Sequence, residues 1–145
     1  MDNLILLVED NEDDAILLKY TLESAGIFNP VHVVETAAAA LRYLAGEEEY
    51  SDRRKYPFPG AAFVDLKLPG GSGLQVLEWL KKHVPPGEVL RVVLTGSDDP
   101  EDLKQSYALG ANCYLQKPLT TEQLTSPNRS IRMMLARAER MAQAA

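Results

Sequence analysis

The chain is organised around one short apolar run that ends in an acid. Residues 61–64 are Ala-Ala-Phe-Val, Asp65 follows directly, and a loop with Pro69 and three glycines comes next. An uninterrupted apolar run of this length is typical of a strand buried on both faces. Such a strand brings the residue after it to the carboxyl edge of the sheet, where open α/β sheets hold their ligands. We therefore expect Asp65 to lie in a functional site.

Three other apolar runs also end in polar residues. Residues 4–8 lead to Glu9 and Asp10, residues 89–94 lead to Thr95 and Gly96, and residues 113–116 lead to Lys117 and Pro118. If these strands are parallel neighbours, three carboxylates, a hydroxyl and an ammonium converge on one edge of the sheet. The sequence thus predicts one polar site assembled from four strand ends.

Helical segments separate the predicted strands. Asn11, Thr36 and Asp99 each stand before such a segment and are favourable N-cap residues. Strands that alternate with helices predict a doubly wound α/β sheet with right-handed crossovers. The expected strands are 4–8, 31–34, 61–64, 89–94 and 112–116, and the expected helices begin near residues 12, 37, 73 and 100. In the helix after Asp99 we expect Leu103, Tyr107 and Ala108 to face inward.

The length of 145 residues suits one domain with a core of its own. Pro127 would break a helix at that point, since it lacks a backbone N–H. We therefore expect Ser126 and Pro127 to begin a separate last helix. The domain should cover residues 1–126, and the helix of residues 127–145 should pack on that domain and extend it. Ile131 and Leu135 should cover the sheet, and Ala138 should lie beyond its edge. The connection over residues 47–60 is predicted to be a surface insertion.

The composition excludes several functions. The net charge of −6 argues against binding of nucleic acid, which requires a basic face. The longest apolar runs are strand-sized, so we expect no membrane segment. The single cysteine and the acidic start at Asp2 favour a reducing, cytoplasmic location without a signal peptide.

The converging residues suggest phosphoryl chemistry. Carboxylates crowded together repel one another unless a cation joins them, and an oxygen-only cluster suits Mg²⁺. With Mg²⁺ beside it, Asp65 could attack phosphorus, while Thr95 and Lys117 bind phosphoryl oxygens. Gly96 would leave space for the incoming group. Each residue alone has an ordinary structural explanation, but their joint occurrence at successive strand ends is specific.

This set of residues resembles the receiver domain of two-component response regulators, of the chemotaxis-regulator type, over about residues 3–126. The resemblance implies a flavodoxin-like, five-stranded parallel sheet in the order 2-1-3-4-5. It implies that Asp65 accepts phosphate from a sensor histidine kinase or a histidine phosphotransfer protein. Such a chain is not an enzyme with a separate substrate, but catalyses its own phosphorylation and dephosphorylation.

The resemblance also assigns roles to individual residues. Asp10 and Asp65 would ligate Mg²⁺, Glu9 would act through water, and the Lys67 carbonyl would complete the protein ligands. Tyr114 would be an aromatic switch that turns inward when Thr95 moves, and Lys117–Pro118 would be a cis peptide. The acids of residues 9–14, the long connection and residues 111–114 further resemble the stand-alone regulators that partner bacterial phytochromes.

Two other classes of protein share part of this pattern. A haloacid-dehalogenase-like phosphatase also uses an Asp nucleophile after a strand, but it requires a second Asp where this chain has Lys67. A flavodoxin-like FMN module would bind phosphate in the loop after its first strand, where the acids Glu9 and Asp10 would repel it. The 28 residues after Lys117 are too few for a DNA-binding module, so we expect output by protein contact. A homodimer through the C-terminal helix or the helix after Asp99 is one such contact.

Overall fold

The computed structural model describes residues 3–125 and 131–144, in which helices and strands alternate as expected. In chain order the elements are β1 (Ile5–Val8), α1 (Glu12–Ser24), β2 (Val31–Val34), α2 (Ala37–Ala45), the 3₁₀ helix η1 (Glu48–Ser51), β3 (Ala61–Val64), β4 (Lys67–Leu68), β5 (Gly71–Ser72), α3 (Gly73–His83), β6 (Leu90–Thr95), α4 (Pro100–Ala108), β7 (Cys113–Gln116), α5 (Thr121–Thr125) and α6 (Ile131–Ala144). Ser126 and Pro127, the expected start of the last helix, lie outside the described residues.

Five strands form one parallel sheet in the order β2-β1-β3-β6-β7. The two-residue strands β4 and β5 pair only with each other, in an antiparallel hairpin. Counted without that hairpin, the order is the expected 2-1-3-4-5, and the flavodoxin-like fold class is confirmed. Val8 of β1 stands opposite Val64 of β3, so the residues that follow these two strands emerge at the same level.

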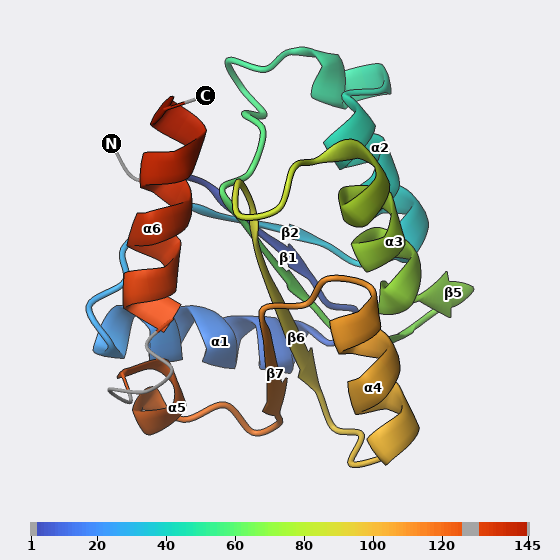
Figure 1. The fold of residues 1–145 in the computed structure, drawn as a ribbon, viewed down its shortest axis with the longest axis vertical. Helices are drawn as coiled ribbons and strands as arrows, with labels where there is room; N and C mark the ends of the chain where they lie inside the picture. The colour runs from blue at the N-terminus through green and yellow to red at the C-terminus, as the bar shows by residue number, and fades with distance from the viewer. Residues whose placement is uncertain (1–2, 126–130, 145) are drawn as a thin grey trace.

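Helices cover both faces of the sheet (Figure 1). On one face, α1, α5 and α6 pack against alternate strand residues that include Ile5, Leu7 and Phe63. On the other face, α2 and α3 pack against the intervening residues, among them Leu6 and Val64. Because successive side chains of a strand point to opposite faces, a sheet buried on both sides needs the continuous apolar runs of this sequence.

Four helices begin at capping residues that the structure shows making their bonds. Asn11, Thr36 and Asp99 accept backbone N–H bonds at the starts of α1, α2 and α4, which confirms the predicted N-caps. Ser72 and Gln75 form a capping box at the start of α3. Each such cap contributes on the order of 1 kcal/mol and fixes where the preceding loop ends. These loops carry the site, so the caps also define its edge.

Two expectations about helix packing are wrong. In α4 the buried residue is Ser106, whereas Leu103 and Tyr107 are 40% and 42% exposed and Ala108 is exposed as well. The helix lies against β7 and buries the side that carries Ser106, so the apolar residues face outward. In α6, Ala138 is buried together with Ile131 and Leu135 and does not lie beyond the sheet.

The connection over residues 47–60 is more than a surface insertion. Tyr50 is buried in the core and packs with Tyr43, Tyr56 and His32 in an aromatic cluster. The guanidinium of Arg53 donates to the carbonyls of Tyr43 and Leu44 at 2.8 and 2.9 Å. It thereby gives the Leu44 carbonyl a donor at the end of α2 and adds a second donor at the Tyr43 carbonyl, which also accepts from the Gly46 N–H. The aromatic residues spaced through this segment therefore anchor it to the domain.

Helix lengths bear on the expectation of no membrane segment. In the two described ranges of the chain, no helix is both long and apolar enough to cross a bilayer.

Candidate functional site

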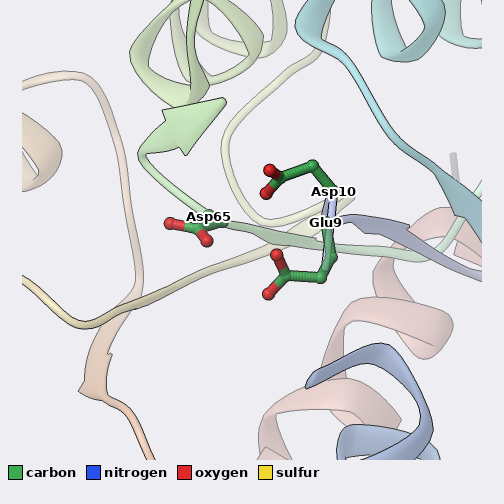
Figure 2. Close-up of side chains that lie close together, drawn as sticks. All are labelled: Glu9, Asp10 and Asp65. Atoms are coloured by element: carbon green, nitrogen blue, oxygen red, sulfur yellow. The ribbon is translucent and has the colours of Figure 1, made fainter. Parts of the chain in front are cut away.

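Three carboxylates meet at the carboxyl ends of β1 and β3. Glu9 and Asp10 follow β1, and Asp65 follows β3 (Figure 2). Each offers one oxygen, and these three oxygens all lie within 4.8 Å of one another. The parallel register that sets Val8 opposite Val64 brings them together, as the sequence predicted.

The three acids differ in burial. Glu9 is 3% exposed and Asp65 is 8% exposed, whereas Asp10 is exposed. Burial raises the pKa of Glu9, and this outweighs the opposing effect of the hydrogen bond from Lys117. A negative charge at Glu9 is therefore costly unless a cation stays beside it.

Lys117 supplies that cation from the end of β7. Its Nζ donates to Asp65 Oδ2 at 2.9 Å, to Asp14 Oδ2 at 2.9 Å, and to Glu9 Oε1. Burial alone would lower the pKa of Lys117, but the hydrogen bonds to these carboxylates outweigh it and raise the pKa. The ammonium has three N–H donors, and each has a carboxylate partner.

The site has the charge for a further cation. Three carboxylates contact the Lys117 ammonium, and Asp10 lies beside Glu9 and Asp65, which leaves an excess of negative charge at the edge of the sheet. Hard oxygen ligands beside solvent are the donors that Mg²⁺ prefers, so the residues fit this ion. Lys67 meets Asp65 through its backbone, with its N–H donating to Asp65 Oδ1 at 3.1 Å, while its side chain is exposed.

Gly73 brings α3 against the backbone of Asp65. A Cβ at Gly73 would lie 2.2 Å from the Asp65 carbonyl oxygen and 2.6 Å from Val64 Cγ1. Only glycine therefore allows this close approach of helix and strand end. By contrast, a Cβ at Gly96 would have open space around it, in agreement with the predicted gap beside the acid.

Thr95 and Tyr114 are joined through one residue of the loop between β6 and α4. The Ser97 N–H donates to Thr95 Oγ1 at 3.3 Å, and the Tyr114 hydroxyl donates to the Ser97 carbonyl at 3.1 Å. The Ser97 hydroxyl in turn donates to Asp102 Oδ2 at 2.6 Å. Ser97 thus ties the strand end to both Tyr114 and the first turn of α4.

The residues predicted at the strand ends lie at this edge of the sheet, whereas Tyr114 lies within β7 opposite Val93 and connects to the edge through Ser97. The Lys117–Pro118 bond is cis as expected. Sequence reasoning missed two contributors, Asp14 and Gly73. No local pattern marks the contact between Asp14 and Lys117, because the two residues are 103 positions apart in the chain. A glycine at the first position of a helix, next to a strand end, was the available signal for Gly73.

A model of the response regulator receiver domain matches residues 5–127. The chain belongs to the response regulator receiver family. Receiver domains act in two-component signalling, so membership of the family gives this chain a role in such signalling.

Known receivers resemble this one over most of its length. Response regulator Rcp1 of Synechocystis sp. is 34% identical over 114 residues, which are 79% of this chain and 76% of that protein. The crystal structure of the phosphorylated cyanobacterial phytochrome response regulator RcpA has a TM-score of 0.73 at 28% identity and covers 100% of this chain and 97% of its own. The Mn²⁺-bound form of Rcp1 has a TM-score of 0.70 at 28% identity, with 99% and 96% covered. The expected similarity to phytochrome response regulators is confirmed.

Proposed function

We propose that this receiver takes a phosphoryl group onto Asp65 from a phosphohistidine of a sensor histidine kinase or a histidine phosphotransfer protein. The observation that carries the proposal is the 2.9 Å contact between the Lys117 ammonium and Asp65, beside the cluster of Glu9 and Asp10. It supplies an acceptor oxygen and a cation for the phosphoryl charge at one point. RcpA, similar over the full chain, is described as phosphorylated. The domain turns over no separate substrate, but promotes its own phosphorylation and dephosphorylation.

In the transfer, an Asp65 carboxylate oxygen attacks phosphorus as the bond from phosphorus to the donor imidazole breaks. The electron pair of that bond returns to the ring nitrogen, and Asp65 becomes an acyl phosphate. Lys117 exchanges its hydrogen bond with Asp65 for one with a phosphoryl oxygen. The hydroxyl hydrogen of Thr95 is available to a second phosphoryl oxygen, because Thr95 Oγ1 acts as an acceptor toward Ser97.

We further propose that Glu9, Asp10, Asp65 and the Lys67 carbonyl hold Mg²⁺, with Glu9 acting through water. When bound, this ion neutralises negative charge on the phosphoryl oxygens as they approach the acids. The oxygen-only donor set supports the assignment, and Rcp1 is described in a Mn²⁺-bound form.

The surface beside the site suits a protein donor. On α1, the apolar side chains of Ile16 and Tyr20 are 59% and 68% exposed, and Leu17 is also exposed. Leu17 lines a 210 Å³ recess together with Lys117 and Pro118, so this apolar surface reaches the acceptor site. We propose that the phosphohistidine donor docks here, in the cytoplasm.

For the output we propose protein contacts at α4 and β7, a homodimer among them. Leu103 and Tyr107 expose apolar surface there, and β7 is an edge strand of the sheet. Tyr114, bonded to the Ser97 carbonyl, connects this surface to Thr95. This surface is favoured over the C-terminal helix, because Ala138 of α6 is buried. We also propose that residues 127–145 extend the domain of residues 1–126, since Ile131 and Leu135 share a core cluster with α1.

Acetyl phosphate with Mg²⁺ tests the phosphoacceptor assignment. The parent protein should gain one phosphoryl group by intact-protein mass spectrometry, and Asp65→Asn should gain none. Asp52→Asn is the matched control, because Asp52 is an exposed acid of the connection over residues 47–60, and this variant should gain one phosphoryl group. An unlabelled parent, or Asp65→Asn labelled as fully as the parent, would overturn the proposal.

A further inference from the structure

Among the described carboxylates that contact Lys117, Asp14 alone has no role in the proposed chemistry. It lies in the first turn of α1, where its N–H donates to Asn11. Its carboxylate crosses to Lys117 Nζ at 2.9 Å, the same distance as that between Nζ and Asp65. Glu9 and Asp65 belong to the cluster suited to a cation, whereas Asp14 does not.

The bonds of Lys117 must rearrange twice in the proposed cycle. All three of its donors engage carboxylates, and two of these carboxylates, Glu9 and Asp65, belong to the cluster suited to a cation. A later phosphoryl group on Asp65 also requires a donor from Lys117. A partner that keeps the ammonium away from Glu9 and Asp65 therefore favours both the binding of the cation and the later change of partner from Asp65 to the phosphoryl group.

Asp14 has the position for that task. Its side chain is 40% exposed, whereas that of Glu9 is 3% exposed, so it stands at the solvent side of Lys117. It also lines the recess that contains Leu17 and Pro118, outside the three-carboxylate cluster. An ammonium held by Asp14 remains at the mouth of the site.

We propose that Asp14 is a positioning residue, which holds the Lys117 ammonium while Glu9 and Asp65 bind the cation and Asp65 then takes the phosphoryl group. This inference rests on the proposed function of Asp65. Without Asp14, the partners that Lys117 keeps among the described residues are Glu9 and Asp65, and the ammonium competes with Mg²⁺ for these two carboxylates. With Asp14, the ammonium keeps a charged partner throughout.

Asp13 is a matched control for Asp14. It occupies the same first turn of α1 and is exposed, and within the described residues it is not among the carboxylates that Lys117 contacts. Asp13→Asn and Asp14→Asn each remove one negative charge at the same helix end. Their difference therefore isolates the contact with Lys117 from the effects of net charge and helix dipole.

The test measures Mg²⁺ binding to the unphosphorylated full chain by isothermal titration calorimetry. Asp14→Asn should weaken Mg²⁺ binding about five-fold relative to Asp13→Asn, the size expected for loss of one partly exposed ion pair. Asp14→Glu, which keeps the carboxylate, should restore most of that affinity. In parallel, Asp14→Asn should slow labelling by acetyl phosphate at low Mg²⁺ and approach the control rate when Mg²⁺ is saturating.

The outcomes separate this inference from the proposed function. Equal Mg²⁺ affinity in the Asp14→Asn and Asp13→Asn proteins, with the parent still labelled on Asp65, would overturn the role of Asp14 alone. A parent that is not labelled would overturn the phosphoacceptor assignment itself. Failure of Asp14→Glu to restore binding would also overturn the positioning role. Thermal unfolding of each variant verifies that the fold is retained.

Discussion

Replacing Gly73 with alanine tests how the site is held in place. The added Cβ would lie 2.2 Å from the Asp65 carbonyl oxygen, 2.9 Å from the Asp65 carbonyl carbon and 2.6 Å from Val64 Cγ1. Carbon atoms in ordinary contact are about 3.5–4.0 Å apart, so helix and strand end must separate by about 1 Å. Two of the three opposing atoms are backbone, which cannot turn away as a side chain can.

The cost can be estimated from this geometry. Overpacking a well-packed core typically costs about 1–3 kcal/mol, and we expect the upper end of that range because backbone is displaced. The higher helix propensity of alanine offsets less than about 1 kcal/mol of this. With a urea dependence of about 1–3 kcal/mol per molar, the midpoint of unfolding should fall by about 1 M. Asp65 should move with its backbone, so phosphorylation should slow about ten-fold or more.

Urea unfolding and labelling by acetyl phosphate measure the two effects on the same proteins. Gly96→Ala is the control, because its Cβ meets open space in the same site. We expect Gly96→Ala to unfold near the parent midpoint, and it is a control for stability alone, because Gly96 borders the space for the incoming phosphoryl group. If Gly73→Ala also behaved like the parent in both assays, the close approach of α3 would not be what positions Asp65.

Three further predictions follow from named contacts. Ile16→Asp on α1 should slow transfer from a phosphohistidine donor but not from acetyl phosphate. Phe28→Asp, which changes another exposed apolar residue, located before β2, should slow neither. An unchanged rate for Ile16→Asp would exclude α1 as the docking surface. If the phosphorylated parent dimerises through α4, light scattering with beryllofluoride should show a dimer that Tyr107→Asp abolishes, and a dimer that survives the change would place the interface elsewhere. Lys117→Met should lower the free energy of unfolding at pH 7 by about 3 kcal/mol, since it leaves buried carboxylates without their cation. The pKa of Lys117 is raised in the folded protein, so its ion pairs stabilise the fold fully below the ordinary pKa of 10.5 and lose this effect as the pH rises through the folded pKa. The difference in free energy of unfolding between the parent and Lys117→Met should therefore shrink at high pH. A difference that does not depend on pH would contradict the ion-pair account.

The sheet and the main site residues could be predicted because their signals are local. An apolar run buried on both faces is visible in a few consecutive residues, and the polar residue after it marks the carboxyl edge. Parallel pairing then brings Glu9, Asp65, Thr95 and Lys117 to one edge, without any knowledge of side-chain contacts.

The errors and omissions concern contacts with weak or distant signals. The inner face of α4 was assigned from Leu103 and Tyr107, but the helix packs through Ser106, and so few apolar residues do not fix the buried side of a short helix. The contact between Asp14 and Lys117 depends on where α1 begins relative to β7, which only the folded chain determines.

The most direct test of the account locates the phosphoryl group itself. After labelling with acetyl phosphate and Mg²⁺, borohydride reduction converts an aspartyl phosphate to homoserine, and peptide mass spectrometry identifies the position. The account predicts homoserine at residue 65 and nowhere else, with the signal absent from Asp65→Asn. Homoserine at Asp10 or another acid in the parent protein, with Asp65 unmodified, would contradict it.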